Sequence, residues 1–271
     1  MNDLVSVVIC FYNEEKYLAD SINSVLAQSY KNLEVIVIND GSTDSSDDVI
    51  SAFNDPRLRY VKFSDKRGLA YRLNHILSSL NGNYIARMDA DDLICSQRIS
   101  KQVKVLNEYT DIDLVTTGIH SINLEGEIVY TRIPPGNIKL DFNKIFKTQH
   151  HIVHASVMAR KSFFERNLYD ESLLRAQDHD LWLRCFLNDD LKVHYIREPL
   201  YSYREDGNLT KEKMAKAYNT AINLLDRYYI LSPLSRFQYI QNKFFIYLKK
   251  LILSVVPFEL LKVVMLKRRS K

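Results

Sequence analysis

Tyr-Ile-Ala-Arg-Met-Asp-Ala-Asp-Asp, at residues 84–92, is the stretch that decides the fold of this chain. It joins a short apolar run to three carboxylates within four residues. Asp89 and Asp91 are two positions apart, and residues at i and i+2 of an extended chain point to the same side. A strand ending here therefore presents two acidic side chains at its carboxyl end, which is where ligands bind in open α/β sheets.

Two carboxylates at one strand end repel each other unless a cation lies between them. Mg²⁺ and Mn²⁺ prefer hard oxygen ligands, and Mg²⁺ sites combine one or two carboxylates with substrate phosphates. Our first hypothesis is therefore a divalent metal that holds a nucleoside diphosphate. The alternative is a solvated acidic turn in which Asp92 caps a helix that begins near Ser96.

The composition indicates a reduced, globular protein. The chain has 271 residues, which fits one large domain or one domain with an appendage. Its three cysteines, Cys10, Cys95 and Cys185, form no Cys-x-x-Cys motif, so neither a zinc nor a redox motif is predicted. The amino-terminal residues lack the basic segment of a signal peptide. We therefore expect a cytoplasmic setting.

The formal net charge of +4 hides an uneven distribution. Residues 211–271 carry 13 Lys or Arg and 3 acids, a net of +10, so residues 1–210 carry a net of −6. An acidic body with a basic tail suggests two separate tasks. The tail could meet nucleic acid or an anionic membrane, and its apolar composition favours the membrane.

Strand and helix patterns alternate through the first half of the chain. Apolar runs predict strands at residues 4–11, 33–38, 58–63, 84–88 and 114–117, and amphipathic segments predict helices at 13–28, from 45, at 68–80 and at 97–108. This alternation predicts a Rossmann-like, mostly parallel sheet with helices on both faces. Residues 119–210 predict a mixed region with a strand at 152–159 and a helix at 180–187.

Two further polar clusters lie at predicted element ends. Asp40 follows the second strand and could accept hydrogen bonds from a base or a ribose, while Asp44 would cap the next helix. Asp178 lies at a predicted helix start, where the helix dipole favours an ionised carboxylate that could act as a general base. The alternative is that Asp178 or Asp180 is only an N-cap, and for Asp180 we prefer this alternative.

Five motifs in this order resemble glycosyltransferase family 2, the inverting GT-A fold enzymes of bacterial polysaccharide synthesis. They are Ser-Val-Val-Ile-Cys-Phe-Tyr-Asn at 6–13, Asp-Gly-Ser-Thr-Asp at 40–44, Gly-Leu-Ala-Tyr-Arg-Leu-Asn at 68–74, Arg-Met-Asp-Ala-Asp-Asp at 87–92 and Gln-Asp-His-Asp-Leu-Trp-Leu-Arg at 177–184. The resemblance covers about residues 4–210. It departs from the family at Cys10, where Pro is usual, and at Leu73, where many relatives have Arg.

The resemblance implies a role for each matching residue. Nucleotide-sugar binding is implied for Tyr12, Asn13, Asp40, Arg72 and Asp89. Mn²⁺ or Mg²⁺ would be held by Asp91 and Asp89, with Asp91 the direct ligand. Asp178 matches the catalytic base, and His154 and Gln177 would lie on the acceptor side.

The chain is expected to divide into two regions. Residues 1–210 would form the GT-A domain, with a nucleotide-sugar half at 1–118 and an acceptor half at 119–210. Residues 211–271 would form a basic, amphipathic helical region. Its longest uncharged apolar run, residues 251–258, is far shorter than the ~20 residues of a membrane-spanning helix.

We therefore expect the tail to lie on the inner face of the cell membrane as a peripheral segment. An apolar helical stripe supports this expectation and consists of Phe237, Ile240, Phe244, Tyr247, Leu248, Leu251 and Val255. The alternative is a helix hairpin packed on the body or on a second subunit.

The leading hypothesis is an inverting, metal-dependent glycosyltransferase. It would transfer a sugar from a UDP-sugar to a hydroxyl of a glycan or an undecaprenyl-diphosphate-linked acceptor in surface polysaccharide synthesis, whether O-antigen, capsule or exopolysaccharide. A sugar-nucleotidyltransferase would need a Gly-rich, basic loop after the first strand, and residues 10–15 are neither. A non-catalytic nucleic-acid-binding protein would need a basic body, and residues 1–210 are acidic.

Overall fold

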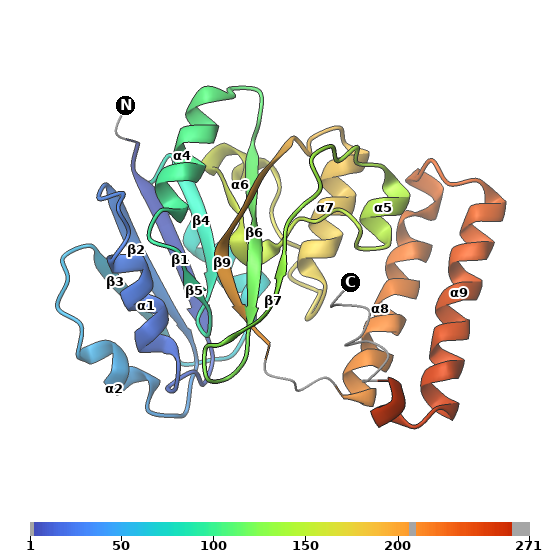
Figure 1. Cartoon of the computed structure of the whole chain (residues 1–271), viewed down its shortest axis with the longest axis horizontal. Coiled ribbons are helices and arrows are strands. Elements are labelled where there is room, and N and C mark those ends of the chain that lie inside the picture. The colour runs from blue at the N-terminus through green and yellow to red at the C-terminus, as the bar shows by residue number, and fades with distance from the viewer. Residues whose placement is uncertain (1–2, 206–209, 262–271) are drawn as a thin grey trace.

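The computed structural model describes residues 3–205 and 210–261. Within them, a single sheet contains every strand. The strands are β1 (Val5–Phe11), β2 (Leu33–Asp40), β3 (Leu58–Phe63), β4 (Tyr84–Asp89), β5 (Leu93–Ile94), β6 (Leu114–Ile122), β7 (Ile128–Arg132), β8 (Met158–Arg160) and β9 (Val193–Arg204). Their order is β3-β2-β1-β4-β8-β6-β9-β5, and β7 pairs with β6 (Figure 1).

The first four strands are parallel, as predicted. In their register Cys10 lies opposite Asp89, and Phe11 lies opposite Asn39. The carboxyl ends of β1, β2 and β4 therefore meet at one edge of the sheet. The second half is mixed, because β8 runs antiparallel to both β4 and β6 while β9 runs parallel to β6.

Helices cover both faces of the sheet, which confirms the predicted α/β class. They are α1 (Leu18–Leu26), α2 (Ser46–Ser51), α3 (Leu69–Leu77), α4 (Arg98–Glu108), α5 (Phe142–Phe146), α6 (Lys161–Arg166), α7 (Gln177–Leu187), α8 (Lys211–Tyr228) and α9 (Arg236–Val255), with 3₁₀ turns η1 (His154–Ser156) and η2 (Tyr229–Leu231). Alternate residues of β1 serve the two faces. Val7 and Ile9 belong to the core that α1 and α4 cover, and Val8 belongs to the core that α3 and α7 cover.

Two local predictions are wrong. The first helix begins at Leu18 rather than Asn13, because Asn13 adopts a left-handed conformation with φ 56° and joins the loop after β2 instead of capping α1. The predicted strand at residues 152–159 is divided into η1 and β8, because the chain makes a 3₁₀ turn in which the Val157 amide bonds to the His154 carbonyl.

The C-terminal helices α8 and α9 form an antiparallel pair beside α5 and α7 (Figure 1). On α8, Leu224, Leu225 and Tyr228 are buried in the core that α3 and α7 cover. On α9, Ser235 and Gln238 form a capping box, and only one face of the helix is buried. None of the helices in the described residues is both long enough and apolar enough to cross a bilayer.

Gly82, which precedes β4, provides a test of this packing. A Cβ at Gly82 would lie 2.5 Å from the Ser6 amide nitrogen, so an alanine must displace backbone of β1. We expect Gly82→Ala to lower the free energy of unfolding by about 1–3 kcal/mol. The same change at Gly136, whose nearest neighbour is a side-chain atom 3.5 Å away, should have little effect. Urea unfolding of the two variants measures the difference, and equal midpoints would contradict the packing.

Candidate active site

The loops after β1 and β2 are joined at the edge of the sheet where these strands end. The Asn13 amide donates to Ser42 Oγ at 2.9 Å, and the Thr43 amide donates to Asn13 Oδ1 at 2.8 Å. The Glu14 amide donates to Ser46 Oγ at 3.0 Å. Asn13 therefore holds the loop after β1 against the loop after β2, through its left-handed backbone and its side-chain amide.

Asp40 is buried at the floor of this edge. Its carboxylate accepts from the amides of Arg67 (2.9 Å) and Gly68 (2.8 Å) and from Arg72 Nε (2.6 Å). A carboxylate offers about four lone pairs, so roughly one acceptor position is left for a ligand. Arg72 is itself 1% exposed, which makes this a buried ion pair. Tyr12 lies nearer the solvent, with Lys66 Nζ 3.2 Å from the centre of its ring.

The three carboxylates after β4 have different environments. Asp89 receives two N–H groups of Arg87, one of them at 3.2 Å. Burial, together with the charge of Asp89, raises the pKa of Asp91 to about 6. Asp92 is fully buried and accepts from the Tyr201 hydroxyl at 2.6 Å and the Arg204 amide at 2.6 Å. The alternative in which Asp92 caps the next helix is therefore wrong, because β9 lies beside this turn and uses its carboxylate.

Glu14 is an acidic member of the site that the sequence did not reveal. Burial raises its pKa to about 7, and the charges of Asp91 and Asp44 add to this effect. In the sequence Glu14 follows Asn13 and is typical of a helix start. Its approach to Asp91 depends on how the loop after β1 folds over the end of β4, which no local pattern encodes.

The donor set fits a hard divalent cation. Asp89 and Asp91 supply carboxylate oxygens, and burial together with the charge of Asp89 raises the pKa of Asp91. No three His, Cys, Asp or Glu side chains within residues 3–205 and 210–261 form a ready metal cage. A cation here would therefore need further oxygens beyond these side chains, and Mg²⁺ sites commonly take them from phosphates or water.

Asp178 is the second residue of α7, at the helix start as predicted. It lies close enough to Tyr169 to help raise the pKa of that phenol, which burial raises most. The prediction that Asp180 is only an N-cap is wrong. Ala176 is the N-cap residue of α7, and Asp180 lies inside the first turn with 0% exposure.

Of the two residues expected on the acceptor side, His154 contacts Tyr169 and Gln177 begins α7. His154 Nε2 is 2.8 Å from the Tyr169 hydroxyl, and its ring packs edge-on against Trp182. Burial and the charge of Arg87 hold the pKa of His154 well below its usual range, so the ring is neutral at neutral pH. Gln177 Oε1 is buried without a hydrogen-bond partner among the described residues.

Arg87 lies between the carboxylates after β4 and the residues around Tyr169, and no role was predicted for it from the sequence. Its guanidinium pairs with Asp89, and its charge acts on His154 and Tyr169. A pattern could have revealed it, because Arg87 is two positions before Asp89 on a strand and so points to the same side.

Comparisons with known proteins identify the class. A model of glycosyl transferase family 2 matches residues 6–168. The chain is 34% identical over 223 residues to an uncharacterized glycosyltransferase of Methanocaldococcus jannaschii. The aligned region covers 80% of this chain and 77% of that protein. The chain therefore belongs to glycosyl transferase family 2, as its motifs suggested.

Two solved structures share the fold. TarS 1-349 of S. aureus in complex with UDP-GlcNAc matches with a TM-score of 0.64 at 17% identity, over 92% of this chain and 72% of that one. The mannosyltransferase PcManGT from Pyrobaculum calidifontis, in complex with GDP-Man and Mn²⁺, matches with a TM-score of 0.61 at 18% identity. This match covers 93% of this chain and 70% of that one. The predicted GT-A fold with a C-terminal helical part is confirmed.

The different environments of Asp91 and Asp92 predict opposite effects on stability. At pH 7.5 the ionised form of Asp91 is disfavoured in the folded protein, because its pKa is raised to about 6. Asp91→Ala should therefore raise the free energy of unfolding by about 1 kcal/mol in EDTA. Burial raises the pKa of Asp92 as well, but Asp92→Ala should lower the free energy of unfolding by about 2–4 kcal/mol, because the Tyr201 hydroxyl and the Arg204 amide lose their acceptor. Thermal unfolding of both variants checks this, and a loss at Asp91 equal to that at Asp92 would contradict it.

Proposed function

We propose that this glycosyltransferase moves a sugar from a nucleoside diphosphate donor, a UDP-sugar, to a hydroxyl of a glycan or lipid-linked acceptor, with inversion at the anomeric carbon. One observation carries the proposal. A pair of acidic side chains lies at the carboxyl end of β4, while a separate carboxylate, Asp178, lies in the first turn of α7 near Tyr169, on which the charge of Arg87 also acts. The structures of TarS with UDP-GlcNAc and PcManGT with GDP-Man and Mn²⁺ give this class of donor a precedent in the fold.

In this proposal the ends of β1 and β2 hold the nucleoside. The half-exposed ring of Tyr12 offers a stacking surface for the base. Asp40 offers its remaining acceptor position to an N–H or O–H of the ligand, and Arg72 donates to that carboxylate and orients it. Asn13 maintains the loop on which Tyr12 lies.

Asp91 and Asp89 would hold Mn²⁺ or Mg²⁺ against the diphosphate. When bound, such an ion neutralises the negative charge that develops on the leaving group. Arg87 binds Asp89 through two nitrogens and fixes the orientation of its carboxylate. Asp91 has no comparable ion pair with Arg87, and we assign it as the direct ligand.

Asp178 would accept the proton of the acceptor hydroxyl as its oxygen attacks the anomeric carbon. The first turn of α7 favours negative charge at this position, because free backbone amides and the helix dipole point toward it. A single displacement with a single base inverts the anomeric centre. His154 is neutral and bonded to Tyr169, so we assign it to shaping the acceptor side rather than to proton transfer.

Turnover of nucleotide-sugars tests the proposed function. We expect purified protein to release nucleoside diphosphate from one of a panel of UDP-, GDP- and dTDP-sugars in the presence of Mn²⁺ or Mg²⁺. EDTA and Asp91→Ala should abolish this release, and Asp178→Asn should reduce it by about 100-fold or more, as removal of a general base does.

Asp189→Asn is the matched control, because Asp189 is exposed just beyond the other end of α7. Its turnover should equal that of the unmodified protein. Release that persists in Asp178→Asn would remove this residue as the base, and calorimetry showing that no nucleotide binds would overturn the whole proposal.

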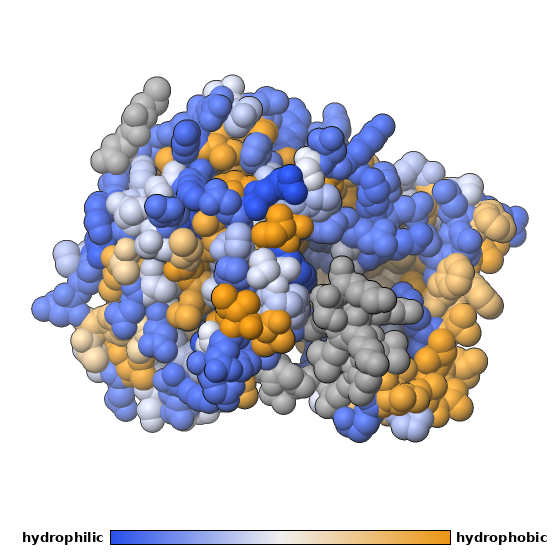
Figure 2. All heavy atoms as spheres, viewed as in Figure 1, coloured by the Kyte–Doolittle hydropathy of each residue, from blue (hydrophilic) through white to orange (hydrophobic). Residues whose placement is uncertain are grey.

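We also propose that the protein binds the inner face of the cell membrane through α9, where it would meet an undecaprenyl-diphosphate-linked acceptor. One face of α9 carries an exposed apolar stripe, and Figure 2 shows hydrophobic side chains gathered over this helix. We call it the outer face of α9, and it consists of Phe237, Ile240, Phe244, Tyr247, Leu248, Leu251 and Val255. The opposite side of the helix is buried through Asn242, Ile246 and Leu253.

Charge favours a lipid surface as the occupant of this face. Between Asp226 and Glu259 the sequence contains no acid and five bases. Those on α9 are Arg236, Lys243, Lys249 and Lys250, and Lys243 is paired with Asp226. An apolar face on a helix whose charged residues are all basic is typical of helices that lie in the headgroup region of anionic membranes.

Sedimentation with vesicles tests the membrane proposal. The full chain should sediment with vesicles containing 30% phosphatidylglycerol and much less with pure phosphatidylcholine. The double change Phe244→Glu with Leu251→Glu should reduce binding at least tenfold, because it places charge in the apolar layer.

The control is Ile128→Glu with Val129→Glu on β7, an apolar pair with 59% and 60% exposure outside α9. It should sediment like the unmodified protein. If the α9 variant binds vesicles as well as the control does, the proposal is wrong. A dimer in ultracentrifugation that only the α9 variant loses would instead assign the face to a second copy.

A further inference from the structure

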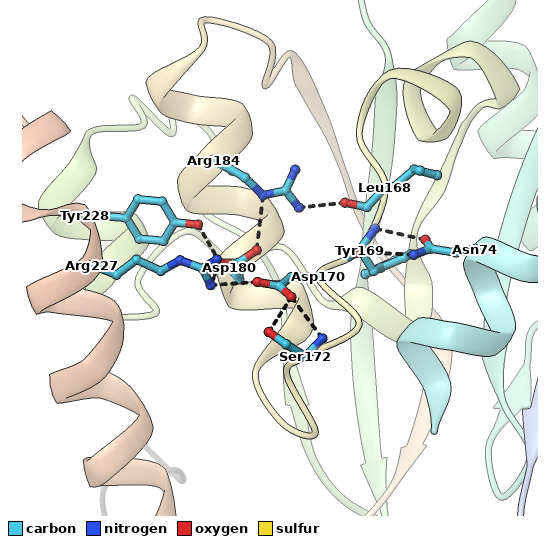
Figure 3. A network of polar contacts seen from close by, with 9 residues as sticks. All are labelled: Asn74, Leu168, Tyr169, Asp170, Ser172, Asp180, Arg184, Arg227 and Tyr228. Atoms are coloured by element: carbon cyan, nitrogen blue, oxygen red, sulfur yellow. Dashed lines mark hydrogen bonds and ion pairs between the residues drawn. The ribbon is translucent and has the colours of Figure 1, made fainter. Parts of the chain in front are cut away.

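A buried carboxylate joins α8 to the helix that carries Asp178 (Figure 3). Asp180 lies in the first turn of α7, two residues after Asp178, with 0% exposure. It accepts from the Tyr228 hydroxyl at 2.5 Å and forms ion pairs with Arg184 (3.1 Å) and Arg227 (3.4 Å). Two of these three donors come from α8 and one from α7 itself.

The contacts from α8 are needed because of this burial. A carboxylate removed from water is strongly disfavoured unless it is paired and hydrogen-bonded. Without α8, Asp180 would keep only Arg184, four residues further along the same helix. The first turn of α7 would then have to move so that Asp180 could reach water, and Asp178 is in that turn.

Arg227 also holds the segment at residues 168–172, on the other side of the network. Its Nη1 lies 2.7 Å from Asp170 Oδ2, and Asp170 accepts from the amide and hydroxyl of Ser172 at 2.9 and 2.6 Å. The backbone of Tyr169 makes two hydrogen bonds with the side chain of Asn74 on α3, each of 2.9 Å. The Tyr169 hydroxyl then reaches His154. Arg227 and Tyr228 of α8 thus contact the first turn of α7, which contains Asp178, and Arg227 also contacts the segment at residues 168–172.

The start of α7 has little local support of its own. Ala176, its N-cap residue, has no side-chain oxygen to accept from the free amides, and it adopts a left-handed conformation with φ 55°. A polar N-cap commonly stabilises a helix start by about 1 kcal/mol, and a left-handed alanine is unfavourable. Tertiary contacts therefore have to hold this turn in place.

We propose that Tyr228 and Arg227 are positioning residues for sugar transfer: the C-terminal helices hold Asp180, and through it the first turn of α7, so that Asp178 faces the acceptor hydroxyl. This inference rests on the proposed function, in which Asp178 is the base. It makes the C-terminal helices part of the catalytic apparatus as well as a surface for docking. Among the described residues, no hydrogen bond or ion pair joins Asp180, Arg227 or Tyr228 directly to the carboxylates at the ends of β2 and β4.

Tyr228→Phe tests the inference in the full chain, because it removes the hydroxyl and leaves the ring. The matched control is Tyr239→Phe on α9. The Tyr239 hydroxyl donates to Asp226 at 2.8 Å, so it too binds a carboxylate, but both partners belong to the C-terminal helices. A general loosening of these helices would affect both variants, whereas a loss of support for Asp180 would affect only the first.

We expect Tyr228→Phe to lower kcat for nucleoside diphosphate release about tenfold while KM for the donor changes less than twofold. Such a split follows because the base moves and the nucleotide site does not. Hydrogen exchange should become at least tenfold faster at the Asp180 amide, which bonds to the Ala176 carbonyl at 2.9 Å. Tyr239→Phe should change neither quantity.

The two readouts separate the inference from the function on which it rests. If the unmodified protein releases no nucleotide from any donor, the proposed function fails, and exchange at Asp180 still decides whether α8 holds this turn. Unchanged exchange in Tyr228→Phe would overturn the inference whatever the activity. Equal losses of kcat in both variants, or a rise in KM that accounts for the loss, would also overturn it.

Discussion

The crowding of three carboxylates at the end of β4 is the constraint on which the rest of the site depends. Like charges this close cannot all remain ionised without compensation. Arg87 pairs with Asp89, and β9 supplies a hydroxyl and an amide to Asp92. Burial and the neighbouring carboxylates still raise the pKa values of Asp91, Asp92 and Glu14, so their ionised forms are disfavoured in the folded protein. A cation bound beside Asp91 would relieve part of this cost.

Ion pairs with at least one buried partner perform the same task in three parts of the molecule. Arg72 holds Asp40 at the end of β2, Arg87 holds Asp89 at the end of β4, and Arg227, together with a tyrosine, holds Asp180 at the start of α7. Such pairs contribute little net stability, because desolvation offsets their attraction. Their geometry is nevertheless strict, since breaking one leaves a buried charge unpaired. They suit a site that must hold a donor and a base in fixed relation.

The C-terminal helices have two sides with different tasks in this scheme. Their inner side contributes Tyr228 to the buried network around α7, and the outer face of α9 leaves its apolar side chains exposed. Under the two proposals, a lipid surface would bind the same helix pair that supports the catalytic base. Docking and catalysis would then share one rigid element, because α8 and α9 pack along each other.

The sequence alone determined the alternation of strands and helices, the meeting of β1, β2 and β4 at one edge, and the family, because periodicity and motif spacing are local properties of the chain. Arg87 was also within reach of such reasoning. Only the tertiary structure decided that Asp92 binds β9, that Glu14 approaches Asp91, and that Asp180 is a buried anchor rather than a cap. These contacts join residues 48 to 112 positions apart or depend on how one loop folds over another strand. No local pattern encodes which distant donor a buried carboxylate will find.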